Sequence, residues 1–278
     1  MPVVFVGHGS PMNAIEDNVW SRGFRDLGSR LPPPSRILAI SAHWYIRGTA
    51  VTGNDWPPTI HDFGGFPEPL YEVQYLARGD PTLANRVVDL LGRDTASTSL
   101  DWGLDHGTWS VLRHLRPAAD CPVVQLSVDA RAMASRHLEI GRALAPLRDE
   151  GVLILGSGNI VHNLSDAFSR QRSGDLKTPA WAAECDGAVA HALEQHDTDA
   201  LARFIESPEG RKAHPTPDHY LPLLYAAGAA GGDPVSFPIT GFDLGSLSMR
   251  SVLFSGGPQD PKQRRAQPPR PPRGSPDG

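Results

Sequence analysis

Val3-Val-Phe-Val-Gly7-His8 opens the chain with a short apolar run that ends at a glycine and a histidine. A second apolar run of strand length, Arg36-Ile-Leu-Ala-Ile-Ser41, follows a segment from Val19 to Leu31 whose apolar residues recur at helical spacing. Strand, helix and strand in this order form a βαβ unit, which favours parallel strands joined by a right-handed crossover. The pattern predicts an α/β fold with a central mixed, largely parallel β-sheet flanked by helices.

The rest of the chain continues to alternate between strand-like and helix-like segments. Further strands are predicted at 123–128, 151–156, 235–239 and 247–254, and helices at 81–91, 109–115, 132–148, 181–196, 199–204 and 220–228. The stretch from Thr49 to Tyr75 is rich in glycine, proline and aromatic residues. A loop of this length without regular structure is usually functional, so we expect it to form a pocket wall.

Composition limits the class of protein. With 278 residues the chain is at the upper end of what one core supports, and its net charge of -5 gives no basic surface for nucleic acid. No apolar run is long enough for a transmembrane helix, and the N-terminus lacks the charged start of a signal peptide. Cys121 and Cys185 form no CxxC unit, which favours a reducing cytoplasm. No membrane partner is expected.

The last residues differ in composition from the rest. From position 256 to 278 the sequence is dominated by proline, arginine, glycine and other small or polar residues, with no large apolar side chain. Such a segment cannot bury enough surface to offset the entropy of ordering. We therefore predict one domain at 1–255 and a disordered Pro/Arg-rich tail at 256–278.

Histidine is unusually frequent, with 11 residues in the chain. His8 follows the first predicted strand and His43 the second, so both are expected at the carboxyl ends of parallel strands, where ligands of α/β proteins bind. His106, His162 and His219 also lie beside glycines, prolines or predicted strand ends. Several histidines that face one cavity are a common way to hold a divalent metal. The sequence predicts a metal-dependent enzyme with its site at this rim.

Each histidine also has a simpler interpretation. His8, between two glycines, could cap a turn, and His43 could be a hydrogen-bonded core residue. His106 follows Asp105, which could fix its tautomer. His162 follows Gly156-Ser-Gly-Asn159, either a plain strand-to-helix connection or a turn whose N–H groups face an anion. The sequence has no HExxH, GxSxG, Walker or GxGxxG motif, so the usual hydrolase, kinase and nucleotide-cofactor signatures are missing.

Six motifs in order resemble one known family. They are Gly7-His-Gly-Ser-Pro-Met-Asn13, Ser41-Ala-His-Trp44, His61-Asp-Phe-Gly-Gly-Phe-Pro67, Asp105-His-Gly107, Gly158-Asn-Ile-Val-His-Asn-Leu164 and Pro215-Thr-Pro-Asp-His-Tyr-Leu-Pro222. In these residues the chain resembles the DOPA 4,5-dioxygenase type of class III extradiol ring-cleavage dioxygenases, which is related to the catalytic subunit of protocatechuate 4,5-dioxygenase. The motifs span the chain from residue 3 to about 254, so the resemblance implies that residues 1–255 form one catalytic domain.

The resemblance implies one mononuclear Fe(II) or Zn(II) per chain, held by His8, His43 and His219. It places His162 within reach of the metal, as a further ligand or as the acid/base, and His106 as an assisting catalytic residue. In relatives the third ligand is a glutamate, which completes a two-His, one-carboxylate set. An imidazole in its place makes the site more positive by one charge, which favours zinc as well as iron. Three further residues are expected in the substrate pocket: Ser10, His61 and Asp62.

The activity that the resemblance implies is ring opening of a catechol with O₂, beside the two hydroxyls, to give a semialdehyde. The expected partners are a small catecholic substrate and O₂, and the chain is expected to be a cytoplasmic monomer or homodimer. Two alternatives remain from the residues themselves. One is a zinc-dependent non-redox enzyme that uses a zinc-bound hydroxide as a hydrolase does, and the other is a non-catalytic metal-binding protein.

Overall fold

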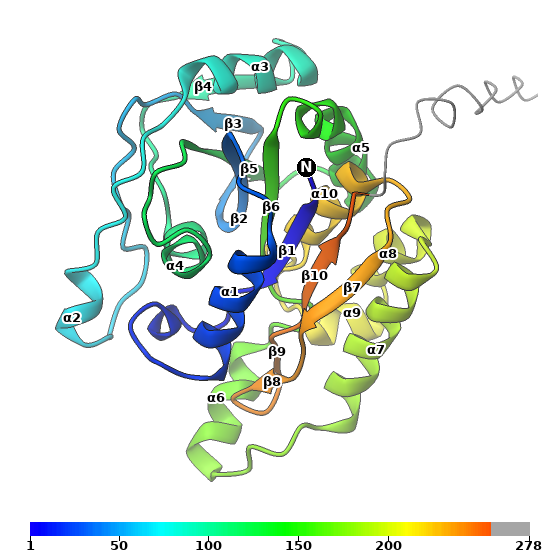
Figure 1. Ribbon diagram of the computed structural model, residues 1–278. Helices are drawn as coiled ribbons and strands as arrows, with labels where there is room; N and C mark the ends of the chain where they lie inside the picture. Colours follow the sequence, from blue (N-terminus) through cyan, green and yellow to red (C-terminus); the bar gives the residue numbers. More distant parts are fainter. Residues whose placement is uncertain (257–278) are drawn as a thin grey trace, which may run out of the picture.

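The fold is built around one eight-stranded sheet, shown in Figure 1. The computed structural model describes residues 1–256, so the tail predicted at 256–278 lies outside the described residues apart from Gly256. The strands are β1 (Val3–Gly7), β2 (Arg36–Ile46), β3 (Thr49–Thr52), β4 (Ala96–Ser99), β5 (Val123–Asp129), β6 (Val152–Gly158), β7 (Val235–Ile239), β8 (Phe242–Asp243), β9 (Leu247–Ser248) and β10 (Ser251–Phe254).

Helices separate most of these strands. They are α1 (Val19–Arg30), α2 (Glu68–Tyr71), α3 (Pro81–Leu91), α4 (His106–Leu115), α5 (Ala134–Leu144), α6 (Leu164–Ser173), α7 (Ala180–Glu194), α8 (Thr198–Phe204), α9 (Pro208–Ala213) and α10 (Leu221–Ala230), with 3₁₀ turns η1 (Pro11–Ala14) and η2 (Ala145–Arg148). None of the described helices combines the length and the apolar composition needed to cross a bilayer.

The strand order is β4-β3-β5-β2-β6-β1-β10-β7, while β8 and β9 pair in a separate two-stranded sheet. The central strands β5, β2, β6 and β1 are parallel, and antiparallel pairing occurs where β3 joins β5 and where β10 joins β1 and β7. This confirms the predicted mixed, largely parallel sheet. Its four parallel strands end at one edge, which is the edge where the histidines were expected.

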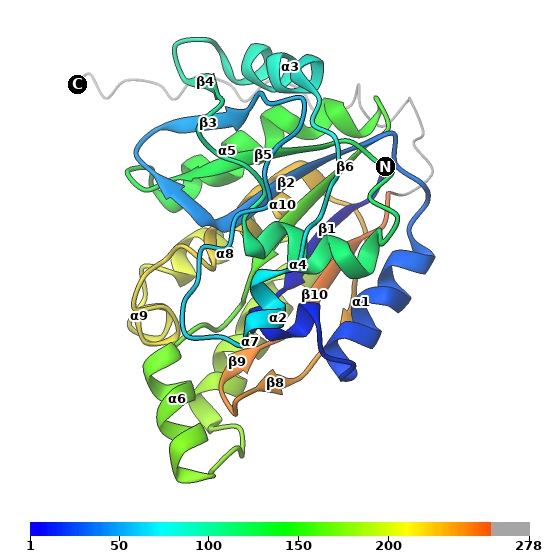
Figure 2. The same ribbon diagram turned by 90° about the vertical axis from the view of Figure 1, so that its left-hand side faces the viewer.

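Alternate residues of each central strand pack on opposite faces of the sheet. In β1, Val3 and Phe5 belong to one apolar core and Val4 and Val6 to the other, all fully buried. Helices α5 and α10 cover the first face, and α1 and α4 the second, as Figures 1 and 2 show. Burial on both faces explains why these strands are continuously apolar rather than alternating.

The predicted pairing of the first two strands is wrong. The βαβ pattern suggested that β1 and β2 pair with each other, but β6 lies between them and pairs in parallel with both. The strand that separates them comes much later in the chain, so local periodicity could not reveal it. As a result three strand ends, those of β1, β6 and β2, meet at the carboxyl edge.

Several element boundaries also differ from those predicted. β2 continues past the expected end to Ile46, and its pairing with β5 is interrupted between Ile40 and Tyr45. The helix expected from Trp109 begins at His106, because Asp105 caps it by accepting a hydrogen bond from the Thr108 N–H. Strands β3 and β4 and helix α6 were not predicted. Their short or weakly apolar sequences carry little periodic signal.

Candidate metal centre

Five imidazole rings gather beyond the carboxyl edge of the sheet. His8 follows β1, His43 lies at the interruption in β2, His106 begins α4, His162 follows β6 and His219 precedes α10. The His8 ring centroid lies 5.1 Å from that of His43 and 5.2 Å from that of His219, and His43 and His219 are 4.9 Å apart. The His43 and His106 centroids are 3.8 Å apart, and His162 stacks on His219 at 3.5 Å and 5°.

The closest set of ligand nitrogens differs by one residue from the set that the resemblance implies. Among the described residues, His8, His43 and His106 offer nitrogens that all lie within 4.8 Å of one another, which suits a metal ion. His219, expected as the third ligand, is not in that group. Its ring is nevertheless nearer to the His8 ring than the His106 ring is, at 5.2 Å against 5.8 Å between centroids.

The hydrogen bonds of His8 fix which of its nitrogens carries the proton. His8 Nδ1 lies 2.9 Å from Ser157 Oγ, and the Ser157 hydroxyl donates its own proton to the Gly107 carbonyl at 2.5 Å. The Ser157 oxygen must therefore accept from His8, so the proton is on Nδ1. His8 Nε2 consequently carries a lone pair.

Two carboxylates fix the other expected ligands in the same way. His43 Nδ1 lies 3.2 Å from Asp62 Oδ2, and His219 Nδ1 contacts Asp218 Oδ2. Ionised carboxylates only accept hydrogen bonds, so both contacts favour the tautomer with the proton on Nδ1 and a lone pair on Nε2. Acceptors that hold the far nitrogen are the usual support of metal-binding histidines.

His8 and His43 supply the decisive fit to a cation. Their Nε2 atoms lie 3.3 Å apart. With both protons on Nδ1, two lone pairs face each other, and this arrangement is unfavourable unless a cation lies at both nitrogens. The donor set of neutral imidazoles suits zinc and iron. The chain thus has a histidine group able to hold a metal.

Burial keeps these imidazoles neutral. Desolvation, reinforced by the neighbouring histidines, lowers the pKa of His8 and His219 well below the usual value. It lowers the pKa of His43 to about 3 and that of His162 to about 4. Burial alone would raise the pKa of Asp62, but the hydrogen bond and charge of His106 and the charge of His43 lower it to about 2. Neutral rings are the form that binds metal, and the carboxylate behind them stays ionised.

Asp62, rather than Asp105, is the carboxylate that contacts His106. The two Asp62 oxygens lie 2.9 Å from His106 Nδ1 and 2.9 Å from its backbone nitrogen. Asp105, which the sequence suggested for this task, is fully buried and faces away: it accepts from the Ser41 hydroxyl at 2.6 Å and from the Gln125 amide. Neighbours in sequence at the start of a helix project in different directions, so adjacency was a poor guide.

Two glycines allow the histidine-bearing segments to approach one another. A Cβ on Gly107 would lie 2.4 Å from Ser41 Oγ and 2.9 Å from His43 Cδ2, and one on Gly158 would lie 2.1 Å from the His219 carbonyl oxygen. All three distances are shorter than van der Waals contact. The glycines therefore set the spacing between α4 and β2 and between β6 and His219.

The turn after β6 does not bind an anion through its N–H groups as one interpretation suggested. The Asn159 N–H donates to the His219 carbonyl at 2.9 Å, and the Asn159 amide donates to the Ser248 carbonyl. His214 is buried, and its Nε2–H donates to the Ile160 carbonyl, 2.8 Å away. This turn positions His219 instead.

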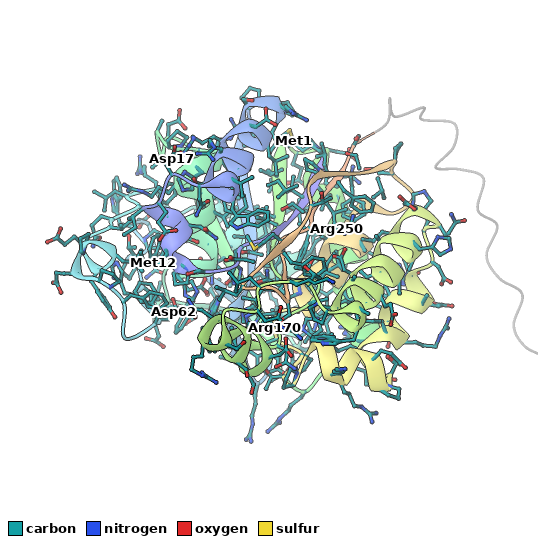
Figure 3. The ribbon with its side chains drawn as sticks, turned by 90° about the horizontal axis from the view of Figure 1, so that it is seen from below. Met1, Met12, Asp17, Asp62, Arg170 and Arg250 are labelled. Carbon is teal, nitrogen blue, oxygen red and sulfur yellow. The ribbon has the colours of Figure 1, made fainter. Side chains whose placement is uncertain are left out.

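A cavity of about 640 Å³ lies over the imidazoles and is lined by all five of them. Figure 3 views this edge from below, with Met12 of η1 and Arg170 of α6 labelled on its sides. Aromatic and apolar residues supply much of its wall: Trp20, Phe63, Phe66, Leu164, Phe168, Leu244 and Leu247. The sequence did not single these residues out, although Phe63 and Phe66 lie in the stretch predicted to form a pocket wall.

The three residues expected in the substrate pocket lie in different places. Ser10 lines the cavity, whereas His61 and Asp62 are not among its lining residues. His61 Nε2 lies 3.0 Å from the Val73 carbonyl, and its ring packs near Trp109, so it supports the wall from behind. Asp62 acts on the site through His43 and His106.

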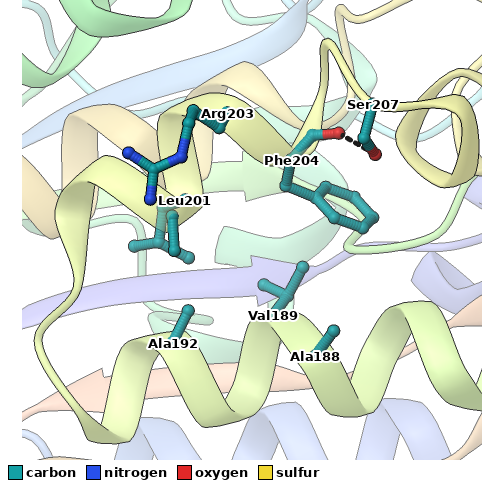
Figure 4. Close-up of a pocket in the computed structure, with 8 residues that line it drawn as sticks. Ala188, Val189, Ala192, Leu201, Arg203, Phe204 and Ser207 are labelled. Atoms are coloured by element: carbon teal, nitrogen blue, oxygen red, sulfur yellow. Dashed lines mark hydrogen bonds between the residues drawn. The ribbon is translucent and has the colours of Figure 1, made fainter.

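A second cavity offers no comparable chemistry. It measures about 260 Å³ and lies between α7 and α8, as Figure 4 shows. Its lining is mainly apolar, with Val189, Leu201 and Phe204 beside the single charged residue Arg203. The histidine-lined cavity is the candidate active site, because the histidines with metal-ligand spacing line it.

Comparison with known proteins agrees with this geometry. The family model described as the catalytic LigB subunit of aromatic ring-opening dioxygenase matches residues 2–252. The chain belongs to this family. The LigB-family chain is 47% identical over 260 residues to 4,5-DOPA dioxygenase extradiol of Escherichia coli (strain K12), a match that covers 91% of this chain and 94% of that protein.

Two further relatives support the same assignment. A protein of Beta vulgaris, also named 4,5-DOPA dioxygenase extradiol, is 39% identical over 259 residues, covering 90% of this chain and 95% of that protein. The crystal structure of an uncharacterized Escherichia coli K12 protein matches with a TM-score of 0.76 and 40% identity, covering 92% of this chain and 100% of that one. The LigB-family chain is an extradiol ring-cleaving dioxygenase, and neither the non-redox nor the non-catalytic alternative is favoured.

Proposed function

We propose that this LigB-family enzyme opens the ring of a DOPA-like catechol with O₂, beside the two hydroxyls, to give a semialdehyde. The observation that carries the proposal is the 3.3 Å approach of the His8 and His43 Nε2 atoms in a cavity of about 640 Å³. The relatives named 4,5-DOPA dioxygenase extradiol support the choice of a DOPA-like ring.

We propose that His8, His43 and His219 hold one mononuclear ion through Nε2. The support is that each has its Nδ1 occupied, by Ser157, Asp62 and Asp218 respectively. Those two carboxylates place negative charge behind the imidazoles and offset the positive charge gained where relatives have a glutamate ligand. His106 keeps its contact with Asp62 and stays beside the substrate.

Fe(II) is the ion that we propose for turnover. A bound metal supplies Lewis acidity to the catechol oxygens and, if it is iron, the electrons that O₂ requires. Zn(II) has no redox chemistry, although imidazole sites bind it well. We expect zinc to fill the same site and to give an inactive enzyme.

His162 is proposed as the acid/base. Its ring lines the cavity, stacks on His219, and is neutral at physiological pH because burial lowers its pKa to about 4. A neutral imidazole accepts the proton of a catechol hydroxyl and can return it later in the reaction. Because the two rings lie in parallel planes, the nitrogen lone pairs of His162 and His219 run parallel and do not converge on one point, so we assign His162 proton transfer and not ligation.

The cavity walls place the ring and exclude water. Phe63 packs edge-on against His106, with centroids 5.4 Å apart, and Leu247 lines another part of the wall. An aromatic substrate gains stacking and apolar contact there. His106, whose Nδ1 lies 2.9 Å from Asp62 Oδ2, is proposed to assist by contacting a catechol oxygen.

We further propose that residues 1–255 form a single catalytic domain and that the enzyme works in the cytoplasm as a monomer or homodimer. The continuous sheet and its two cores support the first statement. Both cysteines, Cys121 and Cys185, are free and buried, which supports a reducing compartment.

Oxygen uptake by anaerobically prepared enzyme tests the proposal. Metal-free protein is loaded with Fe(II) or with Zn(II) and mixed with DOPA or 4-methylcatechol in an oxygen electrode. The Fe(II) form should consume one O₂ for each catechol and generate a coloured semialdehyde, while the Zn(II) form should not. Absence of uptake by the Fe(II) form, with metal bound, would contradict the proposed activity.

Metal analysis of two variants separates the two candidate third ligands. His219→Ala should lose most of the bound metal, and His106→Ala should retain it and lose turnover. The reverse pattern would mean that the compact group of His8, His43 and His106 is the metal site.

A further inference from the structure

Apart from the histidines, the charged residues on the cavity wall are all acidic. Besides the histidines, the charged residues that line it are Glu16 and Asp243, and no lysine or arginine lines it among the described residues. Neither carboxylate belongs to the histidine group that has metal-ligand spacing. Both line the same cavity as the imidazoles, so they are available to the substituent of a catechol bound there.

Asp243 has no cationic partner in the described part of the chain. Two other carboxylates of low exposure do have one: Asp186 pairs with Arg250 and Asp233 with Arg148. Asp243 is about half-buried on β8, and its partners are the neighbouring Leu244 N–H, which donates to Oδ1 at 2.9 Å, and the Trp20 side chain. A half-buried carboxylate without a counter-charge is costly, because its solvation is reduced and nothing replaces it.

The arginine that approaches this region is already occupied. Arg170 of α6 passes close to Gly245, and α6 lies beside β8 in Figures 1 and 2. Its guanidinium pairs with Asp166 at 2.7 Å and with Asp175 at 3.2 Å. Arg170 is thus held by two acidic residues and does not neutralise Asp243.

The surroundings of Asp243 suit a cation from outside the protein. Burial and the charge of Glu16 both raise the pKa of Asp243, so the two carboxylates act on each other, and the Trp20 side chain is a hydrogen-bond partner of Asp243. An indole ring beside a carboxylate offers an ammonium both an ion pair and a π face. A carboxylate on the substrate would be repelled at the same place.

On the basis of the proposed ring-opening activity, we propose that this cavity selects catechols whose side chain ends in an ammonium group. Asp243 is the main specificity-determining residue and Glu16 assists it. Catechols whose side chain carries only a carboxylate are discriminated against. An arylethylamine should therefore be at least as good a substrate as the corresponding amino acid.

Three catechols that share one ring test this inference in the Fe(II)-loaded enzyme. Dopamine ends in an ammonium, 3,4-dihydroxyphenylacetate in a carboxylate, and 4-methylcatechol in neither. We expect kcat/KM for dopamine to exceed that for 3,4-dihydroxyphenylacetate by at least about tenfold, mainly through KM, and to equal or exceed that for DOPA. Equal values for the ammonium and carboxylate substrates would overturn the inference.

Variants of the two acidic residues test which of them causes the preference for an ammonium side chain. In Asp243→Asn the ratio of dopamine to 3,4-dihydroxyphenylacetate should fall about tenfold, and dopamine should lose more than 4-methylcatechol does. Glu16→Gln should give a smaller change in the same direction. Asp55→Asn, at an exposed acidic residue outside the cavity lining, should leave the ratio unaltered. An unchanged ratio in Asp243→Asn would refute the assignment.

Binding separates failure of this inference from failure of the proposed function. If even 4-methylcatechol is not turned over, the ring-opening proposal is wrong. Calorimetric Kd values of dopamine and 3,4-dihydroxyphenylacetate for the Zn(II)-loaded enzyme then still test selection by charge. Tighter binding of dopamine, lost in Asp243→Asn, supports it, and indifference to the substituent contradicts it.

Discussion

His8 Nε2 and His43 Nε2 lie 3.3 Å apart, and the groups behind both rings favour the tautomer that leaves a lone pair on each of these nitrogens. The reason is found behind the rings, where Ser157 and Asp62 take the two Nδ1 protons. The orientation of these two rings is thus set by hydrogen-bond acceptors that are not themselves proposed metal ligands. Its properties should change when those acceptors are altered, even if every histidine is retained.

Ser157→Ala removes the acceptor that holds His8. Without it the ring can rotate or place its proton on Nε2, so we expect metal affinity to fall ~10–100-fold. Competition with a chromophoric chelator measures this directly. Ser236→Ala, at an exposed serine whose hydroxyl contacts only the Leu253 carbonyl, is the matched control and should bind metal normally. Equal affinities for the two variants would contradict the tautomer argument.

Asp62→Asn should affect two histidines at once, since Asp62 Oδ2 lies 3.2 Å from His43 Nδ1 and 2.9 Å from His106 Nδ1. An amide can accept only through its oxygen and adds no negative charge behind the rings. We expect metal affinity to fall ~10–100-fold and kcat to fall even at saturating Fe(II), because His106 is also released. Retention of full kcat in the metal-saturated variant would show that Asp62 does not position His106.

Gly107→Ala should destabilise the fold near the metal centre. The added Cβ would meet Ser41 Oγ at 2.4 Å, and such overpacking typically costs about 1–3 kcal/mol. Gly187→Ala is the control, because nothing lies within 4 Å of a Cβ there and the residue is inside α7. Alanine should stabilise that helix by about 0.5–1 kcal/mol. Urea unfolding of both metal-free variants gives the comparison, and similar free energies of unfolding would contradict it.

Acid should destabilise the metal-free protein through histidines that are buried in the neutral form. Burial lowers the pKa of His137 to about 4, from an ordinary value near 6.5. Between these values the unfolded chain binds a proton that the folded one does not, so stability is constant above pH ~6.5 and falls as the pH drops toward 4. The loss amounts to up to about 3 kcal/mol for this one histidine.

His137→Gln tests the acid effect, because glutamine can still bond to the Tyr225 hydroxyl, which lies 3.0 Å from His137 Nδ1. The free energy of unfolding, followed from pH 7 to 4, should fall less steeply in the variant. The difference in slope should correspond to at most one proton bound on unfolding. Parallel pH profiles of the variant and the native protein would show that His137 is protonated equally in both states.

The sequence was informative about what lies at strand ends and uninformative about what lies between strands. Val3–Val6 and Arg36–Ser41 are apolar enough to be recognised as buried strands, and position at their ends was sufficient to place His8 and His43 at one edge. That β6 separates them is a long-range fact, set by packing of residues far apart in the chain. The spacing of apolar residues along the chain holds no information about this strand order.

The supporting acceptors were missed for the same reason. Asp62 and Ser157 reach the histidines from segments remote in sequence, whereas Asp105, the adjacent acidic residue, turns toward Ser41. Asp243 was not predicted to matter at all, because its significance depends on which charges are absent around it. Such absences can be read only from the folded chain.

Anomalous diffraction from crystals of the Zn(II)-loaded enzyme tests the central claim most directly. We predict a single zinc peak bonded at about 2.0–2.1 Å to the Nε2 atoms of His8, His43 and His219, with His162 stacked beside it. A zinc bound to His106 in place of His219, or no zinc between His8 and His43, would contradict this account.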